Sequence, residues 1–348
     1  MTAAFDILSA SCEELESWFV SRGEKPFRGR QVFRWLHRRC AMSFDEMTDL
    51  TKGLRARLPE MAALCGARID GRQRSVDGTI KYRFRLHDGQ SIEGVFIPEQ
   101  RRSTLCISTQ VGCAMGCAFC ATASMGLKRS LSAGEITGQL EAAVRDLRGE
   151  TGSARPVSNV VFMGMGEPLA NLDAVVQAVR ILIDPRGMDI GRRHVTVSTA
   201  GLPAAMEDFV HRVPVRLAVS LNASTDEQRS RLMPVNRRHP IAELLRTCRN
   251  LPLQHNDRIT FEYVLLGGVN DGLDDAERLA GLLEGLPAKV NLIPFNPCPG
   301  IPFEPPPPGR AEAFADRLAA LHVTAMVRKS RGADLQAACG QLAARGPL

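Results

Sequence analysis

Three closely spaced cysteines, Cys113, Cys117 and Cys120, are the residues of this chain with the clearest chemical meaning. Gaps of three and two residues place three thiolates in one short loop, enough to hold three irons of a cubane iron–sulfur cluster. The fourth iron would stay open to a ligand from outside the protein. A structural zinc site is the alternative, but it needs four ligands, usually as two separated pairs, and the chain has no second pair. The spacing therefore favours a reactive cluster.

Polar residues follow several predicted strands downstream of this loop. The run Gly164-Met-Gly166-Glu167-Pro168 could let a ligand approach the backbone at its glycines and pair an ammonium group with its carboxylate. An ordinary strand-to-helix turn is the alternative. The ends of three other predicted strands carry Ser198, then Ser220, Leu221 and Asn222, and finally Asn296. Because parallel strands share their carboxyl-terminal edge, these residues are candidates for one ligand site.

The elements that would position these groups alternate between apolar strands and amphipathic helices. Strands are predicted at 104–109, 159–163, 194–198, 216–220, 258–264 and 290–294. Six β/α units of this kind predict an α/β fold, with a parallel sheet closed fully or partly into a barrel and reactive groups at the strand ends. The proline-rich stretch 294–308 is predicted to be a loop that covers something.

The region before the barrel divides into two parts. Residues 9–62 predict short helices, with a capping box at Ser11-Cys-Glu-Glu14. Alternating residues between 67 and 98, with Asp88-Gly89 at the turn, predict a β-hairpin. We therefore expect a helical accessory domain at 1–62, a β-hairpin extension at 63–103, the barrel at 104–300 and a C-terminal helix, strand and segment at 301–348.

The CxxxCxxC loop resembles that of the radical S-adenosylmethionine (SAM) superfamily, and longer segments resemble one family within it. These segments are LCISTQVGC at 105–113, VFMGMGEP at 161–168, NLIPFNP at 291–297 and VRKSRGADLQAACGQL at 327–342. Together they are similar to the RlmN/Cfr family of RNA adenine methyltransferases, over about residues 10–343. The resemblance implies a partial (β/α)6 barrel, a [4Fe–4S] cluster on Cys113, Cys117 and Cys120, and two SAM molecules per turnover.

The family resemblance also implies a chemical role for two further cysteines. C2 of adenine is electron-poor, so it cannot attack the methyl group of SAM as an ordinary nucleophile. In the family one SAM methylates a cysteine, and a radical from a second SAM activates that methyl group for addition to the base. By motif, Cys339 carries the methyl group, Cys106 resolves the adduct through a disulfide with Cys339, and Glu93 accepts a proton. From the sequence alone, a buried structural thiol is the alternative for either cysteine and an exposed strand residue for Glu93.

Contacts to SAM carry over by motif in the same way. The residues implied are Gly166, Glu167, Ser198, Ser220, Leu221, Asn222 and Asn296. Leu221 offers only backbone groups or packing. Asn222 stands where many members carry histidine, and the sequence ends shortly after Ala343 where many members continue into a basic tail, which leads us to expect weaker or different RNA binding.

Composition and charge indicate the partners. The chain has 348 residues, 44% hydrophobic and 24% charged, and no apolar run of 18 residues, which predicts a cytoplasmic protein without a membrane span. Its net charge of +6 is uneven, with seven basic residues and one acid between 22 and 39. This cluster and the basic pairs at 101–102, 128–129, 192–193 and 237–238 could follow RNA phosphates, or they could be solvated helix faces.

The resemblance implies C2 methylation of an adenosine in the peptidyl-transferase centre of 23S rRNA, with adenosine 37 of tRNA as a second substrate. It also implies a low-potential electron donor such as flavodoxin, and we expect a monomer. Methylation at C8, as in resistance enzymes of the same family, is the nearest alternative. A glycyl-radical activase and a zinc-stabilised RNA-binding protein are the more distant ones.

Overall fold

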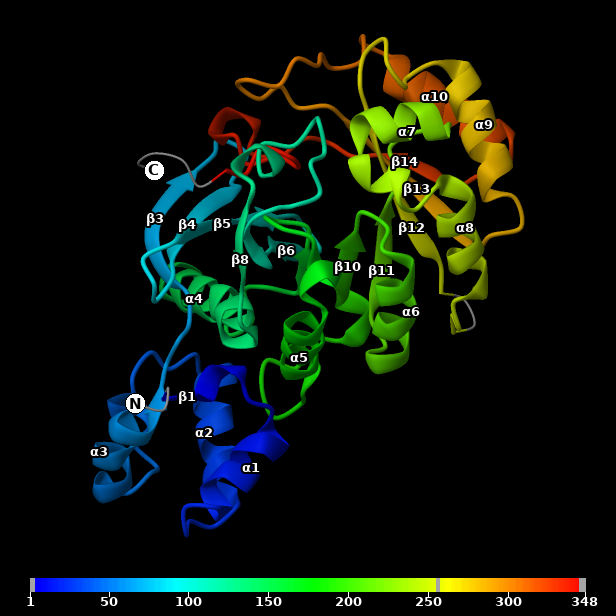
Figure 1. Cartoon of the computed structure of the whole chain (residues 1–348). Helices are drawn as coiled ribbons and strands as arrows, with labels where there is room; N and C mark the ends of the chain where they lie inside the picture. Colours follow the sequence, from blue (N-terminus) through cyan, green and yellow to red (C-terminus); the bar gives the residue numbers. More distant parts are fainter. Residues whose placement is uncertain (1–3, 255–256, 344–348) are drawn as a thin grey trace.

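A mixed ten-stranded sheet is the frame of the molecule (Figure 1). The computed structural model describes residues 4–254 and 257–343. The strand order is β14-β13-β12-β11-β10-β9-β6-β5-β4-β3, and every neighbouring pair from β6 to β14 is parallel. The parallel strands are β6 (Ser103–Cys106), β9 (Asn159–Phe162), β10 (Val195–Thr199), β11 (Arg216–Ser220), β12 (Ile259–Leu265), β13 (Ala288–Pro294) and β14 (Ala325–Val327).

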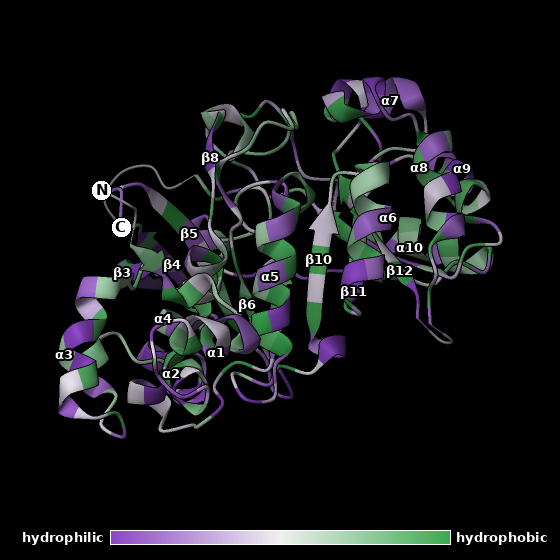
Figure 2. Cartoon of the chain, turned by 60° about the horizontal axis from the view of Figure 1, so that its bottom comes forward, coloured by the Kyte–Doolittle hydropathy of each residue, from purple (hydrophilic) through white to green (hydrophobic). Residues whose placement is uncertain are grey.

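Helices between these strands cover the outer face of the sheet (Figure 1). They are α4 (Ala133–Thr151), α5 (Leu172–Ile183), α6 (Pro203–Arg212), α7 (Asp226–Leu232), α8 (Ile241–Asn250), α9 (Leu273–Leu283) and α10 (Arg310–Ala320). In Figure 2, α5 is largely hydrophobic, whereas α7 at the rim is hydrophilic. Within the described residues β3 and β14 do not pair with each other, so the barrel is partial, as predicted.

The structure shortens one of the six predicted barrel strands and pairs further strands with the sheet or beside the cysteine loop. β14 extends the parallel sheet by one short strand after α10. The strand predicted at 104–109 leaves the sheet after Cys106, and β7 (Gln110–Gly112) pairs instead with β8 (Leu127–Ser130) on either side of the cysteine loop. β3 (Arg68–Arg74) joins the predicted hairpin of β4 (Ile80–Arg85) and β5 (Ser91–Pro98), and β5 pairs with β6, so the extension continues the barrel sheet.

The N-terminal helices pack around their own hydrophobic cluster. α1 (Cys12–Val20) begins at the predicted capping box of Ser11, and α2 (Phe27–His37) and α3 (Lys52–Met61) follow. Most of the buried residues of this cluster lie between residues 7 and 62. The short strands β1 (Phe5–Asp6) and β2 (Ala62–Ala63) pair at the two ends of the same region. His37 Nδ1 lies 2.6 Å from Glu141 Oε1 of α4, a buried contact that joins these helices to the barrel. The domain limits expected above remain predictions.

Candidate active site

The cysteine loop and the strand ends line one cavity, here called the cluster cavity, with a volume of about 160 Å³. Cys113, Cys117 and Cys120 are all on its wall. The facing wall comes from five parallel strands, β9 to β13, as expected for a barrel of this type. The predicted residues among its lining are Gly166, Glu167, Ser198, Ser220 and Asn222.

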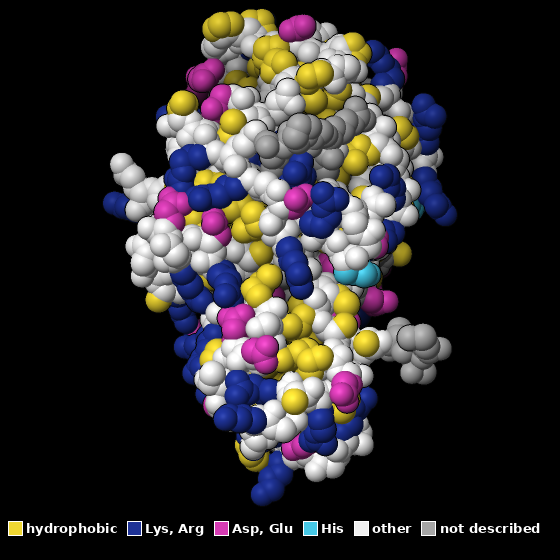
Figure 3. Space-filling model, turned by 90° about the vertical axis from the view of Figure 1, so that its left-hand side faces the viewer, with side chains coloured by type: hydrophobic (Ala, Val, Ile, Leu, Met, Phe, Trp, Pro, Cys, Tyr) yellow, Lys and Arg dark blue, Asp and Glu magenta, His cyan; other side chains and the backbone are white. Residues whose placement is uncertain are grey.

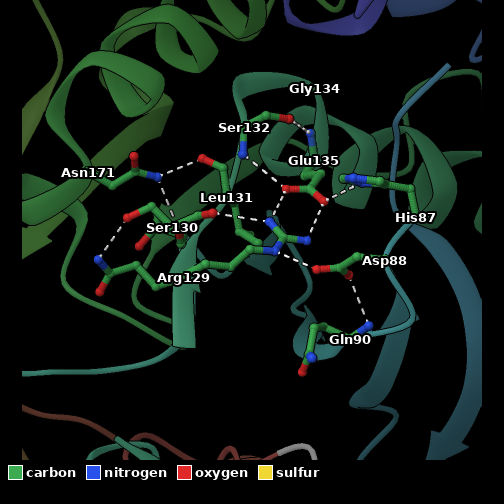
Figure 4. Close-up of polar contacts among 12 residues, drawn as sticks. His87, Asp88, Gln90, Arg129, Ser130, Leu131, Ser132, Gly134, Glu135 and Asn171 are labelled. Carbon is green, nitrogen blue, oxygen red and sulfur yellow. Dashed lines mark hydrogen bonds and ion pairs between the residues drawn. The ribbon is translucent and has the colours of Figure 1, made fainter. Parts of the chain in front are cut away.

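A side-chain network fixes the strand that follows the cysteine loop (Figure 4). Arg129 on β8 bonds both carboxylate oxygens of Glu135 at 2.7 and 2.8 Å, and its Nε lies 2.6 Å from Asp88 Oδ2 in the β4–β5 turn. Ser132 and Glu135 form a capping box at the start of α4. Arg129 was a candidate phosphate contact, but these two carboxylates neutralise its charge. Its position instead joins the loop to α4 and the extension.

The three cysteines suit an iron–sulfur cluster. Burial raises the pKa of Cys113 to about 11 and raises that of Cys117 further, with neighbouring thiols adding to both effects. A bound metal deprotonates such ligands. In the described part of the chain, no three His, Cys, Asp or Glu side chains converge on a position for one metal ion. A cubane binds each cysteine to a different iron, so its ligands need no such convergence.

Glu167 is buried on the wall of the cluster cavity, and no cation in residues 4–254 and 257–343 forms an ion pair with it. Oε1 accepts a hydrogen bond from Leu169 N at 3.0 Å and Oε2 one from Ala200 N at 2.7 Å. Desolvation raises the pKa of this carboxyl, and only hydrogen bonds oppose that effect. The Thr199 side chain is a third hydrogen-bond partner of this carboxyl, and a carboxylate has about four acceptor sites in all, so it can accept a further donor. An ammonium group in the cavity would therefore complement Glu167.

Asn222 adopts a left-handed backbone conformation at the end of β11, with φ of 56°. Its Oδ1 accepts a hydrogen bond from Val264 N at 2.8 Å, which ties β11 to β12. Asparagine and histidine are both among the side chains that tolerate positive φ best. The difference from the histidine of many relatives therefore preserves the backbone path along the cavity.

Two predicted SAM contacts lie elsewhere. Leu221 is fully buried and is not part of the cavity wall; its N–H donates to Glu262 O and its carbonyl accepts from Arg229 Nε. Asn296 lines a second, neighbouring cavity. The predicted set of contacts is therefore brought together except for these two residues.

The second cavity, here called the thiol cavity, has a volume of about 350 Å³ and is lined by both Cys106 and Cys339. Both cysteines are free thiols. Burial raises the pKa of Cys106 to about 12, with a smaller contribution from Cys339. The two cavities share a wall that comprises Cys120, Met163, Gly164, Glu262, Ile293, Cys339 and Gly340. Cys339 therefore lies at the junction, facing both the cluster loop and Cys106.

Cys339 is carried by an irregular segment, here called the C-terminal segment and comprising residues 332–343. Its side chain is exposed to the open junction, while the protein around it raises the pKa of the thiol by desolvation. Ala121 N donates to Gly340 O at 2.7 Å and Thr122 Oγ1 to Leu342 O at 2.5 Å, so the cysteine loop holds this segment directly. Gln341 also donates to Pro297 O, in the predicted proline-rich loop.

Glu93 is deeply buried, with 2% of its surface exposed, and lines neither cavity. Its Oε1 lies 3.0 Å from Lys81 Nζ, and its Oε2 accepts a hydrogen bond from Ala343 N at 3.0 Å. The alternative considered from the sequence, that Glu93 is an exposed strand residue, is therefore wrong. Both carboxylate oxygens already have partners in this structure.

Sequence analysis missed two buried charges near the cavities. Arg229 on α7 is fully buried and donates to the backbone oxygens of Ala200, Ser220 and Leu221, which close β10 and β11. Desolvation lowers its pKa to about 10, and the thiolate form of Cys117 opposes that effect. Glu262 lines both cavities, and desolvation raises its pKa. Alternation along β12 places Glu262 inside the barrel, which is the signal that could have found it.

Comparisons with known proteins agree with this geometry. Residues 5–64 match the ribosomal RNA large subunit methyltransferase N-terminal domain, and residues 107–282 match the radical SAM superfamily. The crystal structure of a radical SAM methyltransferase from Sphaerobacter thermophilus superposes with a TM-score of 0.93 and 45% identity, covering 98% of this chain and all of that one. Fold and site thus define a radical SAM enzyme.

Curated relatives narrow the class to one family. The dual-specificity RNA methyltransferase RlmN of Anaeromyxobacter dehalogenans is 55% identical over 98% of this chain and 92% of the relative. The RlmN of Geobacter sulfurreducens is 51% identical over 98% and 93%. The chain belongs to the RlmN family of radical SAM RNA methyltransferases, which use a [4Fe–4S] cluster and SAM. This family membership is the reason to set aside the two more distant alternatives, a zinc-stabilised RNA-binding protein and a glycyl-radical activase.

Proposed function

We propose that this enzyme methylates C2 of an adenosine in 23S rRNA, and adenosine 37 of tRNA, through a methyl group carried on Cys339. The observation that supports it most is the position of Cys339 between the cluster cavity and the thiol cavity. One thiol can thus receive a methyl group on one side and face a nucleobase and Cys106 on the other. The names of the curated relatives, all RlmN, favour C2 over C8.

In the cluster cavity, Cys113, Cys117 and Cys120 would hold the cluster, which when bound supplies the electron that cleaves SAM to a 5′-deoxyadenosyl radical. Glu167 would pair with the amino group of SAM, because it is buried and no cationic side chain among the described residues pairs with its carboxylate. Gly166, Ser198, Ser220 and Asn222 would contact the rest of the cofactor from the strand ends. We place Asn296 on the thiol-cavity side and give Leu221 only a packing role.

Cys339, at the junction of the two cavities, would lose its proton and attack the SAM methyl group by displacement on the cluster-cavity side. In the thiol cavity, Cys106 would later attack the sulfur of Cys339. The bond from that sulfur to the transferred carbon then breaks, the carbon takes up a proton to become the methyl group of the base, and a disulfide remains. Glu93 would accept the C2 proton. Since Glu93 lines neither cavity here, its partners must first release it.

Basic residues surround the thiol cavity where an RNA would enter. Arg102, Arg328, Lys329 and Arg331 all belong to its lining. Figure 3 shows further Lys and Arg side chains spread over one face of the molecule, with Asp and Glu side chains among them. Such residues bind phosphates with an affinity that falls steeply with salt. We propose that a single adenine enters the cavity, flipped out of its RNA.

The cellular setting is also a proposal. No helix in residues 4–254 and 257–343 is both long and apolar enough to cross a bilayer. We propose that the enzyme acts in the cytoplasm as a monomer, where its RNA substrates and a low-potential donor such as flavodoxin are present. A reducing compartment keeps such cysteines available between turnovers.

The test is an anaerobic reaction of cluster-loaded enzyme with RNA and SAM bearing a deuterated methyl group. Mass mapping is expected to find 2-methyladenosine in rRNA and in tRNA, and no product with Cys339→Ala. Cys298→Ala is the matched control, because Cys298 lines neither cavity. Methylation at C8 would show that the proposed target atom, C2, is wrong. Full activity of Cys339→Ala would contradict transfer through a methyl group on Cys339.

A further inference from the structure

A buried ion pair lies beneath the C-terminal segment. Lys81 Nζ on β4 and Glu93 Oε1 on β5 are 3.0 Å apart, and the two side chains are only 8% and 3% exposed. Charged side chains are rarely buried this deeply unless each is paired. The pair belongs to the β-extension, which lies outside the parallel part of the sheet.

The remaining polar groups of this pair contact both flanks of Cys339. Lys81 Nζ donates to Gln336 O at 3.3 Å, three residues before the cysteine. Glu93 Oε2 accepts from Ala343 N at 3.0 Å, four residues after it. One ion pair therefore holds the two ends of the stretch that carries the thiol.

This stretch has little regular structure of its own. Only a short 3-10 turn at Ala333–Leu335 lies within the C-terminal segment, and none of its described residues belongs to a strand or an α-helix. Its position therefore depends on contacts with other elements. Hydrogen bonds to a buried ammonium and a buried carboxylate are among the strongest available for that purpose.

We propose that Lys81 is a positioning residue for Cys339. By joining Glu93 and the carbonyl of Gln336, it fixes the C-terminal segment so that the thiol faces both cavities. The effect is exerted through the backbone, because Lys81 itself lines neither cavity. Its loss is expected to misplace the thiol while leaving the cysteine loop and Glu167 in position.

A consequence follows for the order of events, and it rests on the proposed role of Glu93. When Glu93 takes the proton from C2, the electrons of the C–H bond stay with the nucleobase adduct and the carboxylate becomes neutral. The neutral acid no longer forms an ion pair with Lys81 and binds Ala343 N less strongly. The segment is therefore held while Glu93 stays paired and is freed when Glu93 leaves its partners for the nucleobase. The ion pair cannot hold it again until Glu93 has lost the proton.

The test follows methylation of Cys339 by SAM in cluster-loaded enzyme without RNA, a step that does not require Glu93 as a proton acceptor. In Lys81→Met, the rate is expected to fall about tenfold to a hundredfold, as for a catalytic group misplaced by about 1 Å. Hydrogen exchange of amides 337–343 should accelerate, whereas reductive cleavage of SAM should stay within about twofold. Lys81→Arg should recover part of the rate, since it keeps the charge.

Two further variants keep the result interpretable. Arg85→Met removes an exposed cation from the same strand and should change none of these readouts. The double variant Lys81→Met with Glu93→Gln removes the unpaired buried charge if Lys81→Met alone folds poorly. The proposal is overturned if Lys81→Met, or the double variant, methylates Cys339 at the wild-type rate with unchanged exchange. If the wild-type enzyme does not methylate Cys339 at all, the proposed function fails instead.

Discussion

The cluster cavity and the thiol cavity share a wall but are built differently. The cluster cavity lies against the ends of parallel strands, whose hydrogen-bonded ladders and buried side chains fix its polar groups. One side of the thiol cavity is the C-terminal segment, which is held by side chains of the cysteine loop and the β-extension. The wall of the cluster cavity is part of the sheet, whereas this wall of the thiol cavity is the C-terminal segment, which has almost no regular structure of its own.

This difference suits the two tasks. Cleavage of SAM needs a fixed geometry with little access to water, which a sheet edge provides. A cysteine that serves two cavities in turn needs a support that can loosen without disturbing the barrel. Each prediction below tests whether one cavity responds while the other does not.

The largest effect is expected from Cys113→Ala, which removes one of the three proposed cluster ligands. Two cysteines cannot hold the cluster, so reductive cleavage of SAM should fall by at least about a thousandfold. Iron content and release of 5′-deoxyadenosine are the measurements, with Cys65→Ala as the control outside both cavities. Hydrogen exchange of amides 337–343 should be unchanged. Faster exchange of these amides would show that the cluster also helps to hold the C-terminal segment.

Arg229→Met should destabilise the cluster cavity as a structure. The change leaves the carbonyl groups of Ala200, Ser220 and Leu221 without their buried donor, and each unsatisfied group costs about 1–3 kcal/mol. The free energy of unfolding in urea should fall by about 3–5 kcal/mol in total. Arg231→Met, an exposed change on the same helix, should stay within about 0.5 kcal/mol. Equal losses in the two variants would contradict the role given to Arg229.

Methylation of Cys339 should rise with pH. Desolvation holds the pKa of this thiol above its ordinary value, so the thiol is mostly protonated between pH 7 and 9. In that range the thiolate fraction, and with it the rate, should grow about tenfold per pH unit. The rate is measured by mass spectrometry with SAM and without RNA, at SAM concentrations that saturate binding at each pH. A flat profile would mean that the thiol is already ionised in the assembled site.

The smallest effect is expected from Asn222→His. Both side chains tolerate the positive φ at this position, so SAM cleavage should change by no more than about twofold. Asn222→Val is the contrasting variant, because a β-branched residue is strained there and should cost considerably more. If histidine impaired cleavage as much as valine, the Asn222 side chain rather than its backbone would be decisive.

The cluster cavity could be predicted largely from sequence because local patterns encode it. Spacing within one loop identified Cys113, Cys117 and Cys120, and the apolar strands ended close to the observed positions of Ser198 and Ser220. Parallel strands then bring such ends to one edge without any knowledge of tertiary contacts. Arg229 escaped notice since nothing in a run of charged residues on α7 shows which one is buried.

The thiol cavity could be predicted only through the family resemblance. The C-terminal segment on its wall is held by contacts between residues more than 200 positions apart, such as Lys81 with Gln336 and Glu93 with Ala343. Neither periodicity nor capping signals contain that pairing. Counting charges in the sequence could not show that Arg129 pairs with Asp88 and Glu135, for a related reason.

The central claim is that Cys339 receives a methyl group at the cluster cavity and delivers it in the thiol cavity. The direct measurement starts with enzyme whose Cys339 has been loaded with a deuterated methyl group and freed of the labelled SAM. RNA, reductant and unlabelled SAM are then added for one turnover. The account predicts that the methyl group on the RNA carries deuterium and that the label leaves the Cys339 peptide. An unlabelled RNA methyl group, with deuterium retained on Cys339, would contradict it.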